Sequence, residues 1–167
     1  MSLDDGRSER GSGHEMSYEA IIEQLGITLP SAPKPVANYV PVVRVGDLLF
    51  LSGVLPSRDG QLIMTGKLGA DLSVEHGVEA ARTAALNALA IVKAEAGSLD
   101  RVKRIVKMVG HIASAPGFTD QPQVLNGASD LFVRIFGEAG RHARVAVGAA
   151  ELPRRAPVEI ELIVQIG

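Results

Sequence analysis

Hydrophobic and polar positions along the first half of the chain predict one short helix and a β-hairpin. Apolar residues recur at helical spacing over 18–25, and Gly26 follows as a stop signal. Two β-like runs, at 39–45 and 48–52, are separated by a Gly-Asp pair, a two-residue turn that suits a hairpin. The turn-rich stretch 57–69 is expected to be a loop.

The second half of the chain alternates between longer helices and strands. Ser73 is a good N-cap for an apolar-periodic helix that ends at Gly97, and a second helix is expected over about 122–136. Runs of apolar and β-branched residues predict strands at 102–112 (with a break at Gly110), at 143–149 and at 157–166.

The order β-β-α-β-α-β-β after a short N-terminal helix predicts an α+β fold, in which two main helices pack on one face of a mixed sheet. A length of 167 residues suggests a single domain, expected over 17–167. Residues 1–16 are polar and rich in Gly and Ser, so we expect them to be a disordered tail or a remnant of recombinant expression.

Composition excludes several kinds of chemistry. The chain has no cysteine, which rules out disulfides, Cys-ligated zinc, iron–sulfur clusters and thiol nucleophiles. A net charge of -2, no Trp, four Phe and two Tyr argue against a nucleic-acid partner. No apolar run is long enough to cross a membrane, so we expect a cytoplasmic protein with no membrane partner. The core must use many small alanines, and burial between subunits would therefore help the fold.

A metal centre and a serine triad are both poorly supported. The four histidines lie in separate segments without recognisable ligand spacing, so we expect no metal site. They are His14, His76, His111 and His142. No G-x-S-x-G motif surrounds Ser52, which is either a hydroxyl donor near a cleft or an ordinary serine at a strand end.

Arg144 is a more informative residue. In the strand 143–149 it shares a face with Ala146 and Gly148, two very small residues that leave room above the sheet. Such a space could hold a small carboxylate, because the guanidinium group matches a carboxylate bidentately. The alternative is an arginine at the rim of the sheet that pairs with a structural glutamate.

Two carboxylates, Glu159 and Glu161, share one face of the last strand, while the opposite face is apolar. Such a pair is either a solvated face or a group that orients water beside an anion site. If the last two strands form a simple hairpin, Arg144 pairs near Gln165, and Glu159 lies roughly 20 Å away. A site that uses both residues then needs a bulge, a different strand pairing, or closure across subunits.

Several spaced motifs resemble one family. HARVAV, ELPRRAP and VEIELIV are similar to its C-terminal pattern P-A-R-x-x-V, L-P and V/I-E-I-E, and YVPVVRVGDLLFLSGVLP (39–56) is similar to its N-terminal Y-V and S-G pattern. On these motifs residues 33–167 resemble the RidA/YjgF family, also called Rid or endoribonuclease L-PSP. The N-terminal helix, the 57–72 loop and the GASDLF segment resemble a longer, divergent subgroup.

The resemblance implies a chorismate-mutase-like fold in a trimeric barrel assembly, with three clefts between the subunits of a homotrimer. It implies hydrolysis of reactive enamines and imines, such as 2-aminoacrylate, to 2-oxo acids and ammonia without a cofactor. By resemblance, Arg144 binds the substrate carboxylate and Glu159 is associated with the reacting water. Tyr39 lines the cleft, and Ser52 and Gly53 form its wall.

Two further positions follow from the resemblance. Asn126 matches an asparagine on the second helix that a neighbouring subunit contributes. Ala146 stands where many members of the family have a cysteine, two residues after the arginine, so any contribution of a thiol is lost here.

The sequence thus supports a deaminase in which Arg144 binds a small carboxylate and Glu159 positions water. A non-catalytic trimer that binds small carboxylates, to regulate or sequester metabolites, is the alternative. Ribonuclease activity is the third reading, and the negative net charge and the absence of a catalytic histidine pair argue against it.

Overall fold

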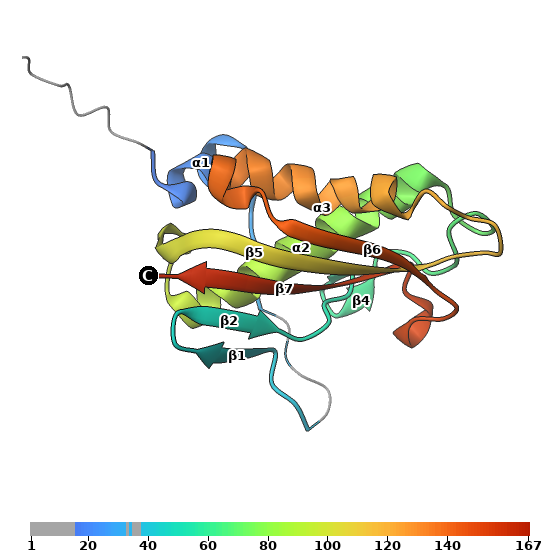
Figure 1. Cartoon of the computed structure of the whole chain (residues 1–167), viewed down its shortest axis with the longest axis horizontal. Helices are drawn as coiled ribbons and strands as arrows, with labels where there is room; N and C mark the ends of the chain where they lie inside the picture. The colour runs from blue at the N-terminus through green and yellow to red at the C-terminus, as the bar shows by residue number, and fades with distance from the viewer. Residues whose placement is uncertain (1–15, 33, 35–37) are drawn as a thin grey trace, which may run out of the picture.

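A five-stranded mixed sheet with the strand order β1-β2-β7-β5-β6 forms the centre of the molecule (Figure 1). The computed structural model describes residues 16–32, 34 and 38–167, so the predicted tail, apart from Met16, lies outside the described residues. The strands of this sheet are β1 Val42–Val45, β2 Leu48–Leu51, β5 Val102–Ala113, β6 Ala143–Ala149 and β7 Val158–Ile166.

Two long helices cover one face of the sheet, as expected. They are α2, Val74–Ala96, and α3, Gln121–Phe136, and Figure 1 shows both on the same side of the strands. Ser73 caps α2 and shares a capping box with His76, and Gly97 ends the helix in the left-handed conformation. Seven of the eight alanines of α2 are buried, and the helix packs against α3 and the sheet, where small side chains let the elements approach closely.

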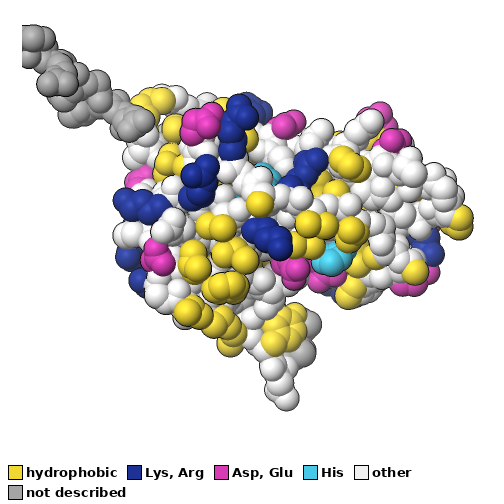
Figure 2. Space-filling model, in the orientation of Figure 1, with side chains coloured by type: hydrophobic (Ala, Val, Ile, Leu, Met, Phe, Trp, Pro, Cys, Tyr) yellow, Lys and Arg dark blue, Asp and Glu magenta, His cyan; other side chains and the backbone are white. Residues whose placement is uncertain are grey.

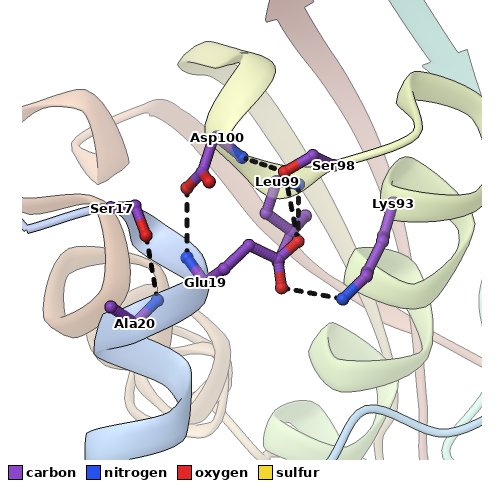
Figure 3. A network of polar contacts seen from close by, with 7 residues as sticks. All are labelled: Ser17, Glu19, Ala20, Lys93, Ser98, Leu99 and Asp100. Atoms are coloured by element: carbon purple, nitrogen blue, oxygen red, sulfur yellow. Dashed lines mark hydrogen bonds and ion pairs between the residues drawn. The ribbon is translucent and has the colours of Figure 1, made fainter.

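The short helix α1, Tyr18–Gln24, is anchored by Glu19 to the end of α2 (Figure 3). The Glu19 carboxylate accepts hydrogen bonds from Lys93 Nζ at 2.7 Å, Leu99 N at 3.0 Å and Ser98 Oγ at 3.3 Å. Burial alone would raise the pKa of Glu19, but these hydrogen bonds outweigh it and the net pKa is lowered. An N-terminal segment is thus tied to the core through one carboxylate.

Two local expectations are corrected. The predicted loop 57–69 contains a small hairpin of β3, Ser57–Arg58, and β4, Gln61–Leu62. The predicted break at Gly110 is wrong, because β5 continues through it. A side chain at Gly110 would collide with Leu125 of α3, so the glycine allows α3 to pack closely on β5 and does not interrupt the strand. Three short 3-10 helices complete the chain: η1 Leu99–Arg101, η2 Gly137–Gly140 and η3 Pro153–Arg155.

The last two strands are not neighbours. β5 lies between β6 and β7 and pairs parallel with β6 and antiparallel with β7. Met108 of β5 is therefore opposite both Arg144 and Leu162, while His111 is opposite both Val147 and Glu159. The last two strands therefore do not form the simple hairpin considered from the sequence.

Within the described residues no helix covers the other face of the sheet, which we call the open face. Several apolar side chains there are exposed, and Figure 2 shows hydrophobic side chains gathered over the strands on the viewer's side. The exposed apolar residues on these strands are Val43, Val45, Phe50, Val145 and Val147. These residues form two groups, one on β1 and β2 and one on β6, at the two edges of the sheet. Exposed apolar groups of this size are typical of interaction surfaces in soluble proteins.

Candidate functional site

Arg144 lies on the helix-covered side of β6 and contacts α3. Its Nη1 donates hydrogen bonds to Asn126 Oδ1 at 2.8 Å and to Ser129 Oγ at 3.2 Å. The side chain shares its face with Ala146 and Gly148, because these residues pair with β5 residues that point toward the helices. Among the described residues Arg144 forms no ion pair, so the alternative of a rim arginine paired with a structural glutamate does not hold.

Asn126 belongs with Arg144 in the same chain. The contact lies within one chain, and the expected contribution of Asn126 to the cleft of a neighbouring subunit stays a prediction. The contact arises because α3 connects the parallel strands β5 and β6 and runs antiparallel to them, which places the middle of α3 beside the start of β6. We call Asn126, Ser129, His142 and Arg144 the arginine half-site.

Glu159 borders a cavity of about 300 Å³ at the start of β7. The polar side chains around it come from several elements and include Tyr39, Ser52 and Arg154, while Val54, Leu55 and Ile91 provide an apolar wall. We call Tyr39, Ser52, Gly53 and Glu159 the glutamate half-site. All four residues were expected at one site, and the structure brings them together around this cavity.

Gly53 makes room for the Glu159 carboxylate. A Cβ atom added at Gly53 would lie 2.8 Å from Glu159 Cδ and 3.2 Å from Cγ, and it would overlap Oε1. The neighbouring Ser52 hydroxyl donates a 2.7 Å hydrogen bond to the carbonyl of Val40, which fastens the segment that carries Tyr39 to the end of β2. Ser52 thus shapes the cavity wall by holding a neighbouring segment.

The surroundings of Glu159 favour its protonated form. Burial raises the pKa of Glu159 above its ordinary value, the charge of His111 opposes this rise, and Glu161 adds to it. The carboxylate is about half buried and lies beside a cavity, so it is well suited to accept a proton and return it.

The arginine and glutamate half-sites lie on opposite faces of the sheet. Arg144 is level with Leu162 of β7, three residues along that strand from Glu159 and two strands away. The offset is about 10 Å along the strands and about 10 Å across them. Side-chain alternation points Arg144 toward α3 and Glu159 toward the open face. One chain therefore does not bring the two proposed catalytic residues together.

Sequence reasoning missed three residues near these groups. Ser129 and His142 contact each other next to Arg144, although the four histidines were taken to be unrelated. The spacing of these residues indicates their proximity. Ser129 is three residues after Asn126, on the same face of a helix, and His142 is two residues before Arg144, on the same side of an extended chain. The third is Arg154, which lines the cavity with a left-handed backbone at φ 58 and has no such signal.

No cluster of three or more His, Asp or Glu side chains suited to a metal ion occurs within the described ranges. No helix in that part of the chain is long and apolar enough to span a bilayer.

Comparisons with known proteins agree with the strand order and the motifs. A family model described as "YjgF/chorismate_mutase-like, putative endoribonuclease" matches residues 19–164. Protein TCP17 of Trypanosoma cruzi is 49% identical over 88% of this chain and 92% of its own length. A 2-iminobutanoate/2-iminopropanoate deaminase of Dermatophagoides farinae is 30% identical over 84% of this chain and 94% of its own.

Solved structures show the same fold. A protein of unknown function from Agrobacterium tumefaciens superposes with a TM-score of 0.83 at 46% identity, covering 90% of this chain and 92% of that one. TdcF of E. coli, solved with bound serine, superposes with a TM-score of 0.61 at 26% identity, covering 81% of this chain and 94% of that one. Because the family model spans nearly all of the described residues, the chain belongs to the RidA/YjgF family and has its YjgF/chorismate-mutase-like fold.

Proposed function

We propose that this protein is an imine and enamine deaminase that converts small 2-imino acids to 2-oxo acids and ammonia, working as a homotrimer with its sites between subunits. The observation that carries the proposal is the division of the site. A carboxylate-binding Arg144 and a proton-accepting Glu159 each have prepared surroundings, but they lie on opposite faces of one sheet.

In this mechanism Arg144 binds the substrate carboxylate. Asn126 and Ser129 both hold Nη1, so the remaining donors of the guanidinium group face a ligand. Ala146 and Gly148 share the face of β6 that carries Arg144, and neither places a long side chain beside the guanidinium group. Fixing the carboxylate fixes the position of the adjacent imine carbon.

Glu159 performs the proton transfers. It takes a proton from a water molecule whose oxygen adds to the carbon of the protonated imine, and a carbinolamine forms. Glu159 passes this proton to the nitrogen, the C–N bond breaks, and a lone pair of the hydroxyl oxygen forms the new C=O bond. The hydroxyl proton goes to Glu159 and from there to the departing ammonia, so the protonated imine and one water molecule give the 2-oxo acid and an ammonium ion. A raised pKa suits a group that must both accept and return a proton.

The trimer supplies the missing half of each site. The open face exposes Val43, Phe50, Val145 and Val147, and burying them between subunits would remove an apolar surface from water. In a closed ring each Arg144 would meet the Glu159 cavity of the next subunit. Two relatives agree with a small amino-acid-like substrate, since one is named as a 2-iminobutanoate/2-iminopropanoate deaminase and the other was solved with serine bound.

The first test measures hydrolysis of a 2-imino acid made in place by an amino-acid oxidase, with semicarbazide competing for the imine. An active enzyme lowers the yield of semicarbazone. Arg144→Ala is expected to abolish the effect, whereas Arg134→Ala, which removes an exposed charge elsewhere on α3, should leave it unchanged. Wild-type activity in Arg144→Ala would refute the proposed binding of the carboxylate.

The second test mixes two inactive variants, Arg144→Ala and Glu159→Gln, by co-expression. If each site combines Arg144 of one subunit with Glu159 of the next, every mixed trimer has one intact site, and random mixing restores about one quarter of wild-type activity. If both residues acted within one subunit, mixing would restore nothing. Light scattering on the purified protein gives the subunit number.

The same preparation separates the other readings. Saturable binding of 2-oxobutanoate without hydrolysis of any imine would favour a carboxylate-binding protein over an enzyme. RNA cleavage that survives Arg144→Ala and further purification would favour a ribonuclease.

A further inference from the structure

A chain of polar contacts continues behind Arg144. Its Nη1 lies 3.2 Å from Ser129 Oγ, Ser129 Oγ lies 3.1 Å from His142 Nε2, and His142 Nδ1 lies 2.7 Å from the carbonyl oxygen of Gly140. Asn126 holds the same Nη1 from the other side. Asn126 and Ser129 come from α3, Arg144 comes from β6, and His142 lies just before β6.

The direction of these hydrogen bonds follows from elementary chemistry. A carbonyl oxygen only accepts, so Nδ1 of His142 must carry the proton that it shares with Gly140. In the neutral ring Nε2 is then an acceptor, and the Ser129 hydroxyl donates to it. The lone pairs of Ser129 Oγ are left to face Arg144, whose guanidinium group only donates. Each donor in this chain of hydrogen bonds, from Arg144 through Ser129 and His142 to the Gly140 carbonyl, thus has an acceptor.

The His142 ring is held in place by its packing. It meets Phe132 of α3 edge to face, with the ring centroids 5.7 Å apart and the planes at 80°. Burial lowers the pKa of His142, the Gly140 carbonyl opposes this effect, and the charge of Arg144 adds to the lowering. The neutral ring that the hydrogen-bond sequence requires is therefore the favoured form at neutral pH.

We propose that His142 is a positioning residue for Arg144: by accepting from the Ser129 hydroxyl, it turns the serine oxygen toward Nη1 and thereby sets the orientation of the guanidinium group. This inference rests on the proposed function, in which Arg144 binds a carboxylate. Among the described residues only Nη1 of Arg144 donates a hydrogen bond, so the edge formed by Nε and Nη2 is left for a ligand.

The proposal separates binding from chemistry. His142 touches neither the substrate carboxylate nor the reacting carbon, so its loss should weaken ligand binding and raise KM while kcat changes little. Loss of one hydrogen bond that preorganises a charged donor corresponds to about a five- to tenfold weaker affinity.

Three substitutions test the proposal. His142→Phe keeps a ring against Phe132 but removes the acceptor, and Ser129→Ala removes the hydroxyl. His142→Gln is the conservative variant, because its amide oxygen can reach the hydroxyl in place of Nε2. The dissociation constant for 2-oxobutanoate is expected to rise about five- to tenfold in the first two and to stay near wild type in His142→Gln.

NMR of the ligand-free protein gives a readout that needs no activity. Long-range ¹H–¹⁵N spectra at neutral pH should show His142 protonated at Nδ1 and bare at Nε2. The guanidinium signals of Arg144 should shift in His142→Phe and Ser129→Ala and return toward wild type in His142→Gln.

The outcomes separate this inference from the proposed function. A proton on Nε2 of neutral His142, or wild-type Arg144 signals in His142→Phe and Ser129→Ala alike, would overturn the positioning role even in an active deaminase. If the protein hydrolyses no imine, the deaminase proposal fails, while the tautomer and the Arg144 signals still decide the role of His142. Should His142→Phe not fold, Ser129→Ala and His142→Gln carry the same comparison.

Discussion

A methyl group at Gly53 is expected to displace the Glu159 carboxylate and leave the fold intact. In Gly53→Ala the new Cβ would lie 2.8 Å from Glu159 Cδ, whereas ordinary contacts begin at 3.4 Å. The carboxyl carbon must therefore retreat by about 0.6 Å, and Oε1, which would overlap the methyl group, must move further. Because the obstructing atoms are the end of a flexible side chain, it is this carboxylate that moves.

The effect on catalysis should be large and the effect on stability small. A displacement approaching 1 Å of a group that activates water costs about 10- to 100-fold in kcat/KM. Rotation of one side chain is expected to cost less than about 1 kcal/mol of unfolding free energy. The assays are semicarbazide competition for the imine and urea unfolding followed by circular dichroism.

A matched control and a double variant complete the prediction. Gly167→Ala also adds a methyl group against a flexible side chain, that of Lys103, and it should keep wild-type activity. In a Glu159→Ala background, Gly53→Ala should reduce the residual rate no further, because the group that it displaces is gone. Wild-type kcat/KM in Gly53→Ala, or an equal loss in both backgrounds, would refute the reasoning.

Three further predictions concern stability. Glu159→Gln should raise the Tm at pH 7 by roughly 1–4 °C. Burial raises the pKa of Glu159 in the folded state, so the wild-type protein loses stability as pH rises through that pKa and the carboxyl group ionises. Below the unfolded-state pKa the group is protonated in both states, so the Tm difference between Glu159→Gln and wild type should vanish in thermal scans near pH 4. Gly127→Ala places a Cβ 2.9 Å from the backbone carbon of Val78 and against its oxygen, which forces α2 and α3 apart, so urea unfolding should show a loss of about 2–4 kcal/mol. Glu19→Ala removes the acceptor of Lys93 and should cost about 1–2 kcal/mol, and limited proteolysis should cut near α1 before the core opens.

The helices and strands were largely predictable because their signals are local. The strand 143–149 was predicted with the bounds that the structure gives, and the helix from Ser73 to Gly97 begins and ends at those residues. Alternation with period 2 and apolar spacing near 3.6 depend only on neighbours in the sequence. Gly110 was misread because a glycine in a strand signals either a break or a close approach, and only the position of Leu125 distinguishes the two.

The candidate site residues could be proposed from motifs, but the way the fold groups them could not. Arg144, Glu159 and Ser52 stand out through their patterns, but nothing local says that Ser52 fastens Val40 or that Asn126 contacts Arg144 in the same chain. His142 was dismissed because its partner Ser129 lies on another element, and the contact arises only when α3 packs beside β6.

The order of the elements, the face of each strand on which a residue lies, and the family can all be inferred from the sequence. Which strands are neighbours is seen only in the folded chain. The insertion of β5 between β6 and β7 brings Arg144 level with Leu162 and puts it on the face opposite Glu159. Strand order depends on contacts between segments far apart in the chain, and side-chain periodicity is the same for every partner that a strand could choose. For this reason only the folded chain reveals that Arg144 and Glu159 lie on opposite faces of one sheet.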